Sequence, residues 1–483
     1  RTPRSTLFPY TTLFRSLASV RSPRKHANYH SKNSPTLTIK CRQLSQQVLT
    51  WTQFAAMIRV VILMSKYLKR IIDQALTKEM EAFGAVLLTG PKWCGKTTTA
   101  KQLAKSALYM QDPDKKETYL QTAELQPSAL LVGEKPRLID EWQMAPQLWD
   151  AVRFDIDQQG KEGLYILTGS TTVDEESIDH SGAGRISRLM MRTMSLFESG
   201  DSDGSVSLKE LFINPDDIAA ISSKTIDDVA NLIVRGGWPN SIGKSEDITH
   251  RQIAGYCDVI VKSDIKTIDG VRRDEEKTKA ILRSFSRHVS SQTPNSTILK
   301  DVLSNQEIMH KNTLDEYISA LKKLYVIDDL SAWSPKLRSR TTVRTADTRH
   351  FVDPAIAAYF LGASSKDLIY DPETFGLLFE SMVIRDLRVY AQNLNGSVYH
   401  YKDKDNLEAD AIIHLNDGRW AAFEVKLGSR WIDEGAMNLL ALKSKVDENQ
   451  MNNPSFLAVI TATEFAYKRE DGVFVVPLCC LKD

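Results

Sequence analysis

The sequence predicts an α/β protein with a parallel β-sheet near its N-terminal end, a mostly helical middle and a second α/β region towards its C-terminal end. Three observations support this fold class. An apolar strand, a glycine-rich loop and a helix follow one another over residues 85–108. Further short apolar strands recur at 136–142 and 163–170, with helical sequence between them. Two more, within 407–426, are joined by a turn sequence typical of a β-hairpin.

The length, charge and cysteine content are those of an ordinary multidomain protein. A chain of 483 residues suggests about three domains. Residues 1–63 hold ten of the 62 Lys and Arg but none of the 61 Asp and Glu, so the rest of the chain is acidic. The five cysteines show no metal-binding spacing, which predicts a reducing, cytoplasmic location. The longest apolar run in the head, 60–64, is too short to cross a bilayer, so no membrane partner is expected.

The first 63 residues differ in composition from the rest. They are rich in Arg and Ser and lack acidic residues, which is also typical of a mitochondrial transit peptide. Residues 6–16 resemble a translated sequencing-library adapter, so we interpret 1–63 as a disordered, artefactual extension and expect the native start at Met64. N-terminal sequencing that found earlier residues in native protein would contradict this interpretation.

The motif GPKWCGKT at residues 90–97 fits the G-x4-G-K-[ST] pattern of a phosphate-binding loop. Successive backbone N–H groups can turn inward onto phosphate oxygens there, and the positive end of the following helix favours the same charge. Lys96 would reach the β- and γ-phosphates of ATP, and Thr97 would coordinate Mg²⁺. An ordinary strand-turn-helix is the simpler alternative. The residues expected to bind the nucleotide are Gly90, Pro91, Lys92, Trp93, Cys94, Gly95, Lys96, Thr97, Thr98 and Ser170.

Acidic, hydroxyl and basic residues follow the next predicted strands. Asp140 would hold Mg²⁺ through water, and Glu141 would polarise the attacking water. Thr168 or Ser170 would face the γ-phosphate from the end of the 163–170 strand. Arg185 would stabilise charge on the transferred phosphoryl group, in the same chain or from a neighbouring subunit of a homo-oligomer. A strand-end turn and a solvated loop arginine are the alternatives.

Several segments together resemble a prokaryotic family of AAA-type P-loop ATPases fused to a C-terminal domain of unknown function. These segments are LTGPKWCGKTTTAKQ, LIDEWQMAP, LYILTGS, SGAGRISRLMMRTMSLFESG and IVRGGWP. The resemblance covers residues 64–483 and implies that Arg185 lies near the nucleotide. On this basis 64–205 is expected to be the ATPase core. Residues 206–272 then form a helical connector or lid, with a break at the Gly-Gly-Trp-Pro sequence.

Residues 273–349 are expected to form a winged helix-turn-helix unit. Helices are predicted at 276–290, 297–303 and 312–324, followed by a strand at 325–330. The third helix exposes acidic as well as basic residues, so packing against protein is as well supported as contact with DNA. A basic patch, or alternatively a solvated basic hairpin, offers a route for DNA or RNA to bind the C-terminal half. It consists of Lys336, Arg338, Arg340, Arg344 and Arg349.

The last part, 350–483, resembles restriction-endonuclease-like nucleases. The turn at Asp417 would place Asp410 opposite Glu424 and put Glu424 and Lys426 on one face of the sheet. Asp410 and Glu424 would bind Mg²⁺, joined by Glu380 from the preceding helix, and Lys426 would orient the water. The alternatives are a charged rim on a solvated sheet and a nuclease fold kept for binding alone.

Three functional hypotheses follow from the sequence. The first is a Mg²⁺-dependent ATPase whose nucleotide state controls a C-terminal module associated with nucleic acid. The second is an ATP-gated, Mg²⁺-dependent nuclease, and the third is a non-catalytic DNA-binding regulator. The expected catalytic residues are Lys96, Glu141, Arg185, Asp410, Glu424 and Lys426. The expected metal ligands are Thr97, Asp140, Glu380, Asp410 and Glu424.

Overall fold

The computed structural model describes residues 67–171, 181–268, 270–304, 308–335 and 343–483. The described residues from Tyr67 to Asp483 group into one compact unit. The proposed extension at 1–63 and the expected start at Met64 lie outside the described residues, as do Lys336, Arg338 and Arg340 of the basic patch.

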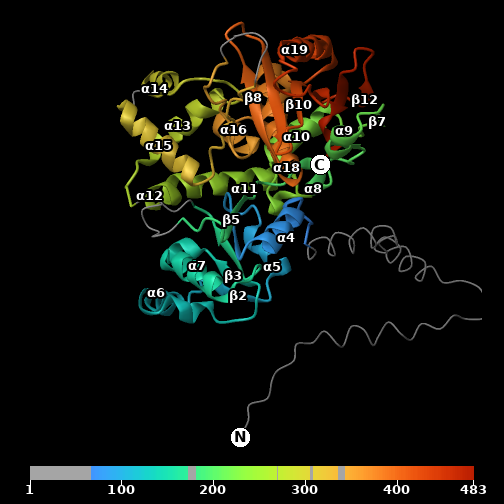
Figure 1. Cartoon of the computed structure of the whole chain (residues 1–483). Helices are drawn as coiled ribbons and strands as arrows, with labels where there is room; N and C mark the ends of the chain where they lie inside the picture. Colours follow the sequence, from blue (N-terminus) through green and yellow to red (C-terminus); the bar gives the residue numbers. More distant parts are fainter. Residues whose placement is uncertain (1–66, 172–180, 269, 305–307, 336–342) are drawn as a thin grey trace, which may run out of the picture. The chain divides into compact units, whose positions relative to one another are not determined.

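A parallel sheet forms the N-terminal part, as predicted, and it has five strands (Figure 1). Its strand order is β2-β3-β4-β1-β5. The central strands β1 and β4 are buried apolar runs because both faces of a parallel sheet are covered by helices. The strands are β1 (Ala85–Thr89), β2 (Ser106–Tyr109), β3 (Arg137–Asp140), β4 (Tyr165–Gly169) and β5 (Ile186–Met190). The helices of this part are α4 (Ile72–Ala82), α5 (Lys96–Leu103), α6 (Lys116–Leu125), α7 (Gln147–Gln159) and the short α8 (Leu196–Ser199).

The middle of the chain is helical, also as predicted. The sequence around α10 explains where this helix begins and ends. Thr225 and Asp228 form a capping box at its start, and Gly236 follows its last residue. The helices are α9 (Leu208–Ile213), α10 (Ile226–Arg235), α11 (Glu246–Val259), α12 (Ile265–Thr267), α13 (Glu275–Arg287), α14 (Asn295–Ser304) and α15 (Lys311–Lys323).

The strand predicted at 325–330 is wrong as a continuous element. Within the described residues this segment makes only single antiparallel bridges, from Ile327 to Phe351 and from Leu330 to Thr348. Turn residues follow α15 directly, and Tyr325 has a positive φ of 55°, which interrupts an extended conformation. The winged-helix interpretation of 273–349 therefore stays a prediction that rests on its three helices.

A mixed seven-stranded sheet forms the C-terminal α/β region, with the order β7-β12-β13-β11-β10-β9-β8. Its edge strand β7 comes from the predicted connector and pairs with β12. The strands are β7 (Ala219–Ile221), β8 (Gly396–Lys402), β9 (Glu408–Leu415), β10 (Trp420–Lys426), β11 (Leu457–Thr461), β12 (Phe465–Lys468) and β13 (Phe474–Pro477). The helices are α16 (Pro354–Leu361), α17 (Ser365–Tyr370), α18 (Pro372–Asn393) and α19 (Ile432–Lys445). A separate pair joins β6 (Val206–Ser207) to β14 (Leu481–Lys482).

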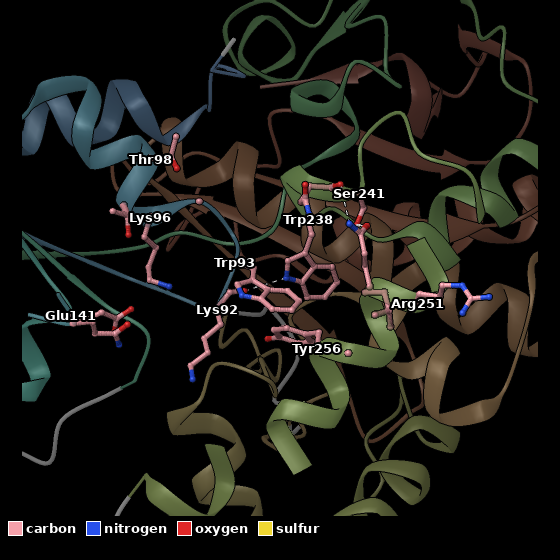
Figure 2. A pocket seen from close by; sticks show the side chains of 16 residues that line it. Lys92, Trp93, Lys96, Thr98, Glu141, Trp238, Ser241, Arg251 and Tyr256 are labelled. Atoms are coloured by element: carbon pink, nitrogen blue, oxygen red, sulfur yellow. Dashed lines mark hydrogen bonds between the residues drawn. The ribbon is translucent and has the colours of Figure 1, made fainter. Parts of the chain in front are cut away.

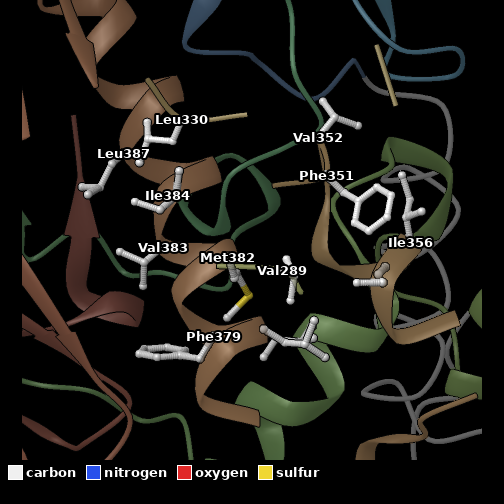
Figure 3. Packing of buried hydrophobic residues seen from close by; sticks show 14 of the residues in the cluster. Val289, Leu330, Phe351, Val352, Ile356, Phe379, Met382, Val383, Ile384 and Leu387 are labelled. Carbon is white, nitrogen blue, oxygen red and sulfur yellow. The ribbon is translucent and has the colours of Figure 1, made fainter. Parts of the chain in front are cut away.

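Helix α18 is buried around most of its circumference, which is typical of a core helix. Its residues Phe379 and Met382 belong to the same apolar cluster as Val289 and Phe351 (Figure 3). The cluster also includes residues of α10, α11 and the C-terminal sheet. Helix α18 is thus the common packing partner of the middle and C-terminal parts.

No helix within the described ranges is both long enough and apolar enough to cross a membrane.

Candidate nucleotide-binding site

The loop between β1 and α5 is shaped by two glycines. Gly90 has a φ of 139°, and a Cβ atom on it would lie 2.0 Å from the carbonyl oxygen of Met191. Gly95, the N-cap of α5, has a φ of 106°. Residues with a Cβ atom rarely adopt this backbone conformation. These glycines allow the loop to curl closely over the start of α5. The partial positive charge of that helix end favours a bound anion.

Lys96 and Thr97 lie at the start of α5, as the motif predicts. The side chain of Lys96 is buried, and its Nζ donates to the carbonyl oxygens of Gly90 at 2.9 Å and Pro91 at 2.8 Å. The Thr97 hydroxyl donates to Asp140 Oδ1 at 2.7 Å, from the end of β3. The Thr168 hydroxyl donates to the same oxygen at 2.5 Å. A hydroxyl and a carboxylate, both oxygen ligands suited to Mg²⁺, are thus brought together beside the loop.

Glu141 follows β3 in a conformation that is uncommon for a residue with a side chain, with a φ of 55°. Its carboxylate accepts a hydrogen bond from the Ser170 hydroxyl at 3.0 Å and a second, short one from the Gln143 amide. Ser170 is buried, and its hydrogen bond orients the Glu141 carboxylate. Such strained residues are held in place by their surroundings and cluster at functional sites.

A pocket of about 740 Å³ opens beside the loop (Figure 2). Its aromatic wall contains Trp93, which is 58% exposed, with its ring centroid 5.8 Å from that of Tyr256. The ring centroids of Tyr256 and Trp238 are 4.8 Å apart. Trp238 Nε1 donates to the Lys92 carbonyl oxygen at 3.2 Å. The residues lining the pocket include Lys92, Trp93, Gly95, Lys96, Thr97, Thr98, Gln111 and Glu141 from the N-terminal part, and Trp238, Asn240, Ser241, Arg251, Gln252 and Tyr256 from the middle.

Arg185 is not placed near this pocket, and the expectation of a role in its own chain's site is wrong. It precedes β5, and its carbonyl oxygen accepts from the N–H of Ala85, the first residue of β1. The phosphate-binding loop follows the last residue of β1, so Arg185 lies at the opposite end of this strand. Its side chain, 48% exposed, pairs with Asp157 at 2.8 Å. Action on a neighbouring chain stays a prediction.

The predicted hairpin of the C-terminal sheet is confirmed, including its register. Residues 420–423 pair with 414–411 in the order expected for a turn centred on Asp417. The regular pairing ends there, and Asp410 Oδ2 accepts from the N–H of Val425 at 2.7 Å. Lys426 Nζ lies 2.8 Å from Glu424 Oε2. The side chains of Asp410, Glu424 and Lys426 therefore gather at one end of β9 and β10.

Burial and mutual repulsion perturb the carboxylates of this cluster. The pKa of Glu380, on α18, lies well above its ordinary value because of burial and then of Asp410. Burial also raises the pKa of Asp410 to about 6, although Lys426 opposes the shift. Glu424 is 2% exposed, and burial and Asp410 hold its pKa well above the ordinary value. The structure thus concentrates acidic groups around the positive charge of Lys426.

The cluster has an unsatisfied oxygen but not a complete set of metal ligands. Glu424 Oε1 is buried and has no hydrogen-bond partner among the described residues. Within these same ranges, however, no three His, Cys, Asp or Glu side chains are grouped closely enough to hold a metal ion. Glu380, Asp410 and Glu424 therefore do not form a three-carboxylate site in this arrangement. A site built on Asp410 and Glu424 stays a prediction.

The described part of the basic patch is engaged within the protein. Arg349 is nearly buried and binds Asp329 at 2.9 Å and Asn295 at 2.6 Å. Arg344 donates to Asn406 at 2.8 Å. The expectation that Arg349 meets a nucleic-acid backbone is wrong, because its guanidinium stabilises the packing of the middle region.

Comparison with known families gives a match for the N-terminal part. Residues 82–199 match a family described as an AAA domain. The match spans the phosphate-binding loop, Asp140 and Glu141, so this region resembles an AAA-type P-loop domain. Residues 226–367 match a domain of unknown function (DUF8612), and residues 375–481 match another (DUF4143). The acidic cluster lies within the second of these matches.

Comparisons with whole proteins add relatives but no function. The chain is 22% identical over 406 residues to the uncharacterized proteins Rv2008c of Mycobacterium tuberculosis and Mb2031c of Mycobacterium bovis. Each alignment covers 83% of this chain and 82% of the relative. Among solved structures, the Walker-type ATPase PABY2304 of Pyrococcus abyssi is 14% identical, covering 60% of this chain and 94% of that one, with a TM-score of 0.37. The ORC1 protein of Aeropyrum pernix in complex with DNA is 12% identical, covering 64% and 97%, with a TM-score of 0.23. Scores this low assign no detailed fold.

Arg70 binds the phosphate-binding loop through a buried contact, and no sequence motif predicted this role. Its buried guanidinium donates to the carbonyl oxygens of Cys94 at 2.8 Å and Arg192 at 2.9 Å, and pairs with Glu198 at 3.0 Å. Cys94 is fully buried, with its Sγ 3.5 Å from the Met191 carbonyl oxygen. Arg70 thus joins the loop to the segment that leaves the AAA domain.

We expect Arg70→Ala to lower the free energy of unfolding by about 3–5 kcal/mol, because the variant leaves the Glu198 carboxylate buried without its cation. Urea unfolding followed by circular dichroism would measure the change. Lys69→Ala alters the exposed neighbouring cation and should change stability by no more than about 0.5 kcal/mol. Equal effects of the two substitutions would contradict the assigned role of Arg70.

Proposed function

We propose that this protein binds ATP and hydrolyses it with the help of Mg²⁺. One observation carries the proposal: the Thr97 hydroxyl meets the Asp140 carboxylate at 2.7 Å beside a loop that ends in Lys96 and a helix N-terminus. Oxygen ligands suited to Mg²⁺ therefore lie next to a loop and a helix N-terminus whose positive charge favours bound phosphates. The AAA domain match over 82–199 supports the same function.

Each residue of the site has a distinct role in this proposal. Thr97 and Asp140 would hold Mg²⁺, which supplies positive charge to the transferring phosphoryl group when bound. Lys96 Nζ would exchange the carbonyl oxygens of Gly90 and Pro91 for phosphate oxygens. Glu141 would accept a hydrogen bond from the attacking water and draw its proton away. The bonds from Ser170 and Gln143 would keep the Glu141 carboxylate oriented.

We expect Glu141→Gln to keep ATP binding but to slow turnover by about 10²-fold or more, because the amide cannot take the proton of the water. Lys96→Ala should weaken binding itself. Calorimetric titration with ATP and a phosphate-release assay separate the two effects. Lys101→Ala, an exposed position on α5, is the matched control. Turnover in Lys96→Ala equal to that of the unaltered protein would contradict the proposed site.

The nucleotide state would reach the C-terminal module through polar contacts that end on α18. Arg192, whose carbonyl oxygen binds Arg70, pairs through its own side chain with Asp328 at 2.7 Å. Asp328 also pairs with Arg388 of α18 at 3.0 Å. A shift of the loop that moved Arg70 would therefore act on α18. Glu380 of the acidic cluster lies on this same helix.

A second candidate function, divalent-dependent cleavage of DNA or RNA, is favoured by the acidic cluster. A bound cation would satisfy the buried Glu424 Oε1 and relieve the repulsion between Glu424 and Asp410. Lys426, which is paired with Glu424, would then orient water or stabilise charge on the phosphodiester. Under this proposal the AAA domain gates the nuclease.

Lys426→Ala is expected to abolish divalent-dependent cleavage while leaving ATP turnover within about twofold of the unaltered protein, because the lysine lies outside the nucleotide pocket. Gel assays on DNA and RNA, with Mg²⁺ or with chelator, would follow cleavage. Lys443→Ala removes an exposed lysine of α19 and should not affect it. Cleavage that persists in Lys426→Ala would assign the activity elsewhere.

A further inference from the structure

A second lysine of the phosphate-binding loop is held by a carboxylate from the middle region. Lys92 Nζ lies 2.7 Å from Asp264 Oδ1, and the two side chains are 38% and 8% exposed. Asp264 closes a π-helical turn (Ile260–Asp264) that continues α11 and leads into α12. Insertions of this kind in a helix frequently occur at functional sites.

The tip of the loop makes two further contacts with the middle region, one of them with α11. The Lys92 carbonyl oxygen accepts from Trp238 Nε1 at 3.2 Å, and the ring of Trp93 packs against Tyr256 of α11. Figure 2 shows Trp93 and Trp238 close together in the wall of the pocket, with Tyr256 beside them. Two consecutive loop residues thus attach the loop to the helical segment at 246–267, and one of these attachments is an ion pair.

A triphosphate in the pocket would compete with Asp264 for the charge of Lys92. Lys92 belongs to the phosphate-binding loop and lines the pocket, so bound phosphates would attract its ammonium group. The Asp264 carboxylate attracts the same group and repels the phosphates. We propose that Lys92 exchanges Asp264 for a phosphate oxygen when ATP binds, and that this exchange loosens the attachment of segment 246–267. The inference rests on the proposed ATP binding.

Such a loosening would affect the three helices that follow, α13, α14 and α15. Arg273 Nη1 donates to the carbonyl oxygen of Ile265 in α12 at 3.1 Å. The N–H of Asp274 donates to the hydroxyl of Tyr317 in α15 at 2.8 Å. The segment that contains Asp264 is therefore linked through Arg273 to the start of α13, and Asp274 links that start to α15. Through the pair of Lys92 and Asp264, bound phosphates would change how firmly these helices are held. This effect is separate from the contacts that lead from Arg70 to α18.

Hydrogen exchange with and without Mg²⁺-ATP tests the proposal. In the unaltered protein, ATP should raise the exchange rate of amides in 246–267 by about threefold or more, because one attachment weakens. Asp264→Asn should show raised exchange without ATP and bind ATP about three- to tenfold more tightly, because the competing carboxylate is gone. The control Asp258→Asn breaks the exposed pair with Lys262 on the same helical stretch and should change neither quantity.

Lys92→Met provides a second, independent variant. It should show raised exchange in 246–267 both with and without ATP, together with weaker ATP binding. If calorimetry shows that the unaltered protein does not bind ATP, the proposed function itself is wrong. If ATP binds but the exchange of 246–267 does not change, or if Asp264→Asn binds ATP no more tightly, the ion pair is structural only and the inference is overturned.

Discussion

The buried guanidinium of Arg70 is the contact on which the nucleotide site depends. Burial acts to lower the pKa of Arg70, but the neighbouring Glu198 raises it above the ordinary value, so the group stays charged. A planar cation with five donors can bind two carbonyl oxygens and a carboxylate at once. Here those acceptors belong to the phosphate-binding loop and to the segment that leaves the AAA domain. The loop is thereby fixed to the rest of the chain and not only to its own sheet.

A second buried cation, Arg385 of α18, joins the parts beyond that segment. It lies between Asp353, at 3.2 Å, and Asp386, at 2.7 Å. Asp353 also accepts from Thr193 and from the N–H of Gly237, and Asp386 accepts from the N–H of Leu196. Breaking a buried pair of this kind is costly, so residues 192–199, the Gly-Gly-Trp-Pro sequence and α18 are expected to move together. Under the proposed function, this arrangement would couple the nucleotide state to the acidic cluster.

Local patterns predicted the loop at 90–97 and the hairpin at 407–426 well, because their chemistry is set by neighbours in the sequence. The position of Arg185 was wrong because Arg185 directly precedes β5, which runs parallel to β1. In a parallel sheet, a residue before one strand lies at the opposite end from a loop that follows the neighbouring strand. Arg70, Asp264 and Trp238 were missed as site residues because their partners are far away in the sequence. The pairing of β7 with β12 was missed for the same reason.

A structure determined with Mg²⁺ and a non-hydrolysable ATP analogue is the most direct test of the central claim. The account predicts the triphosphate against residues 90–97, with Mg²⁺ between Thr97 and Asp140. It also predicts that Lys96 Nζ moves from the carbonyl oxygens of Gly90 and Pro91 to a phosphate oxygen. An analogue bound elsewhere, or bound here with Lys96 still donating to both carbonyl oxygens, would contradict the proposed ATPase site.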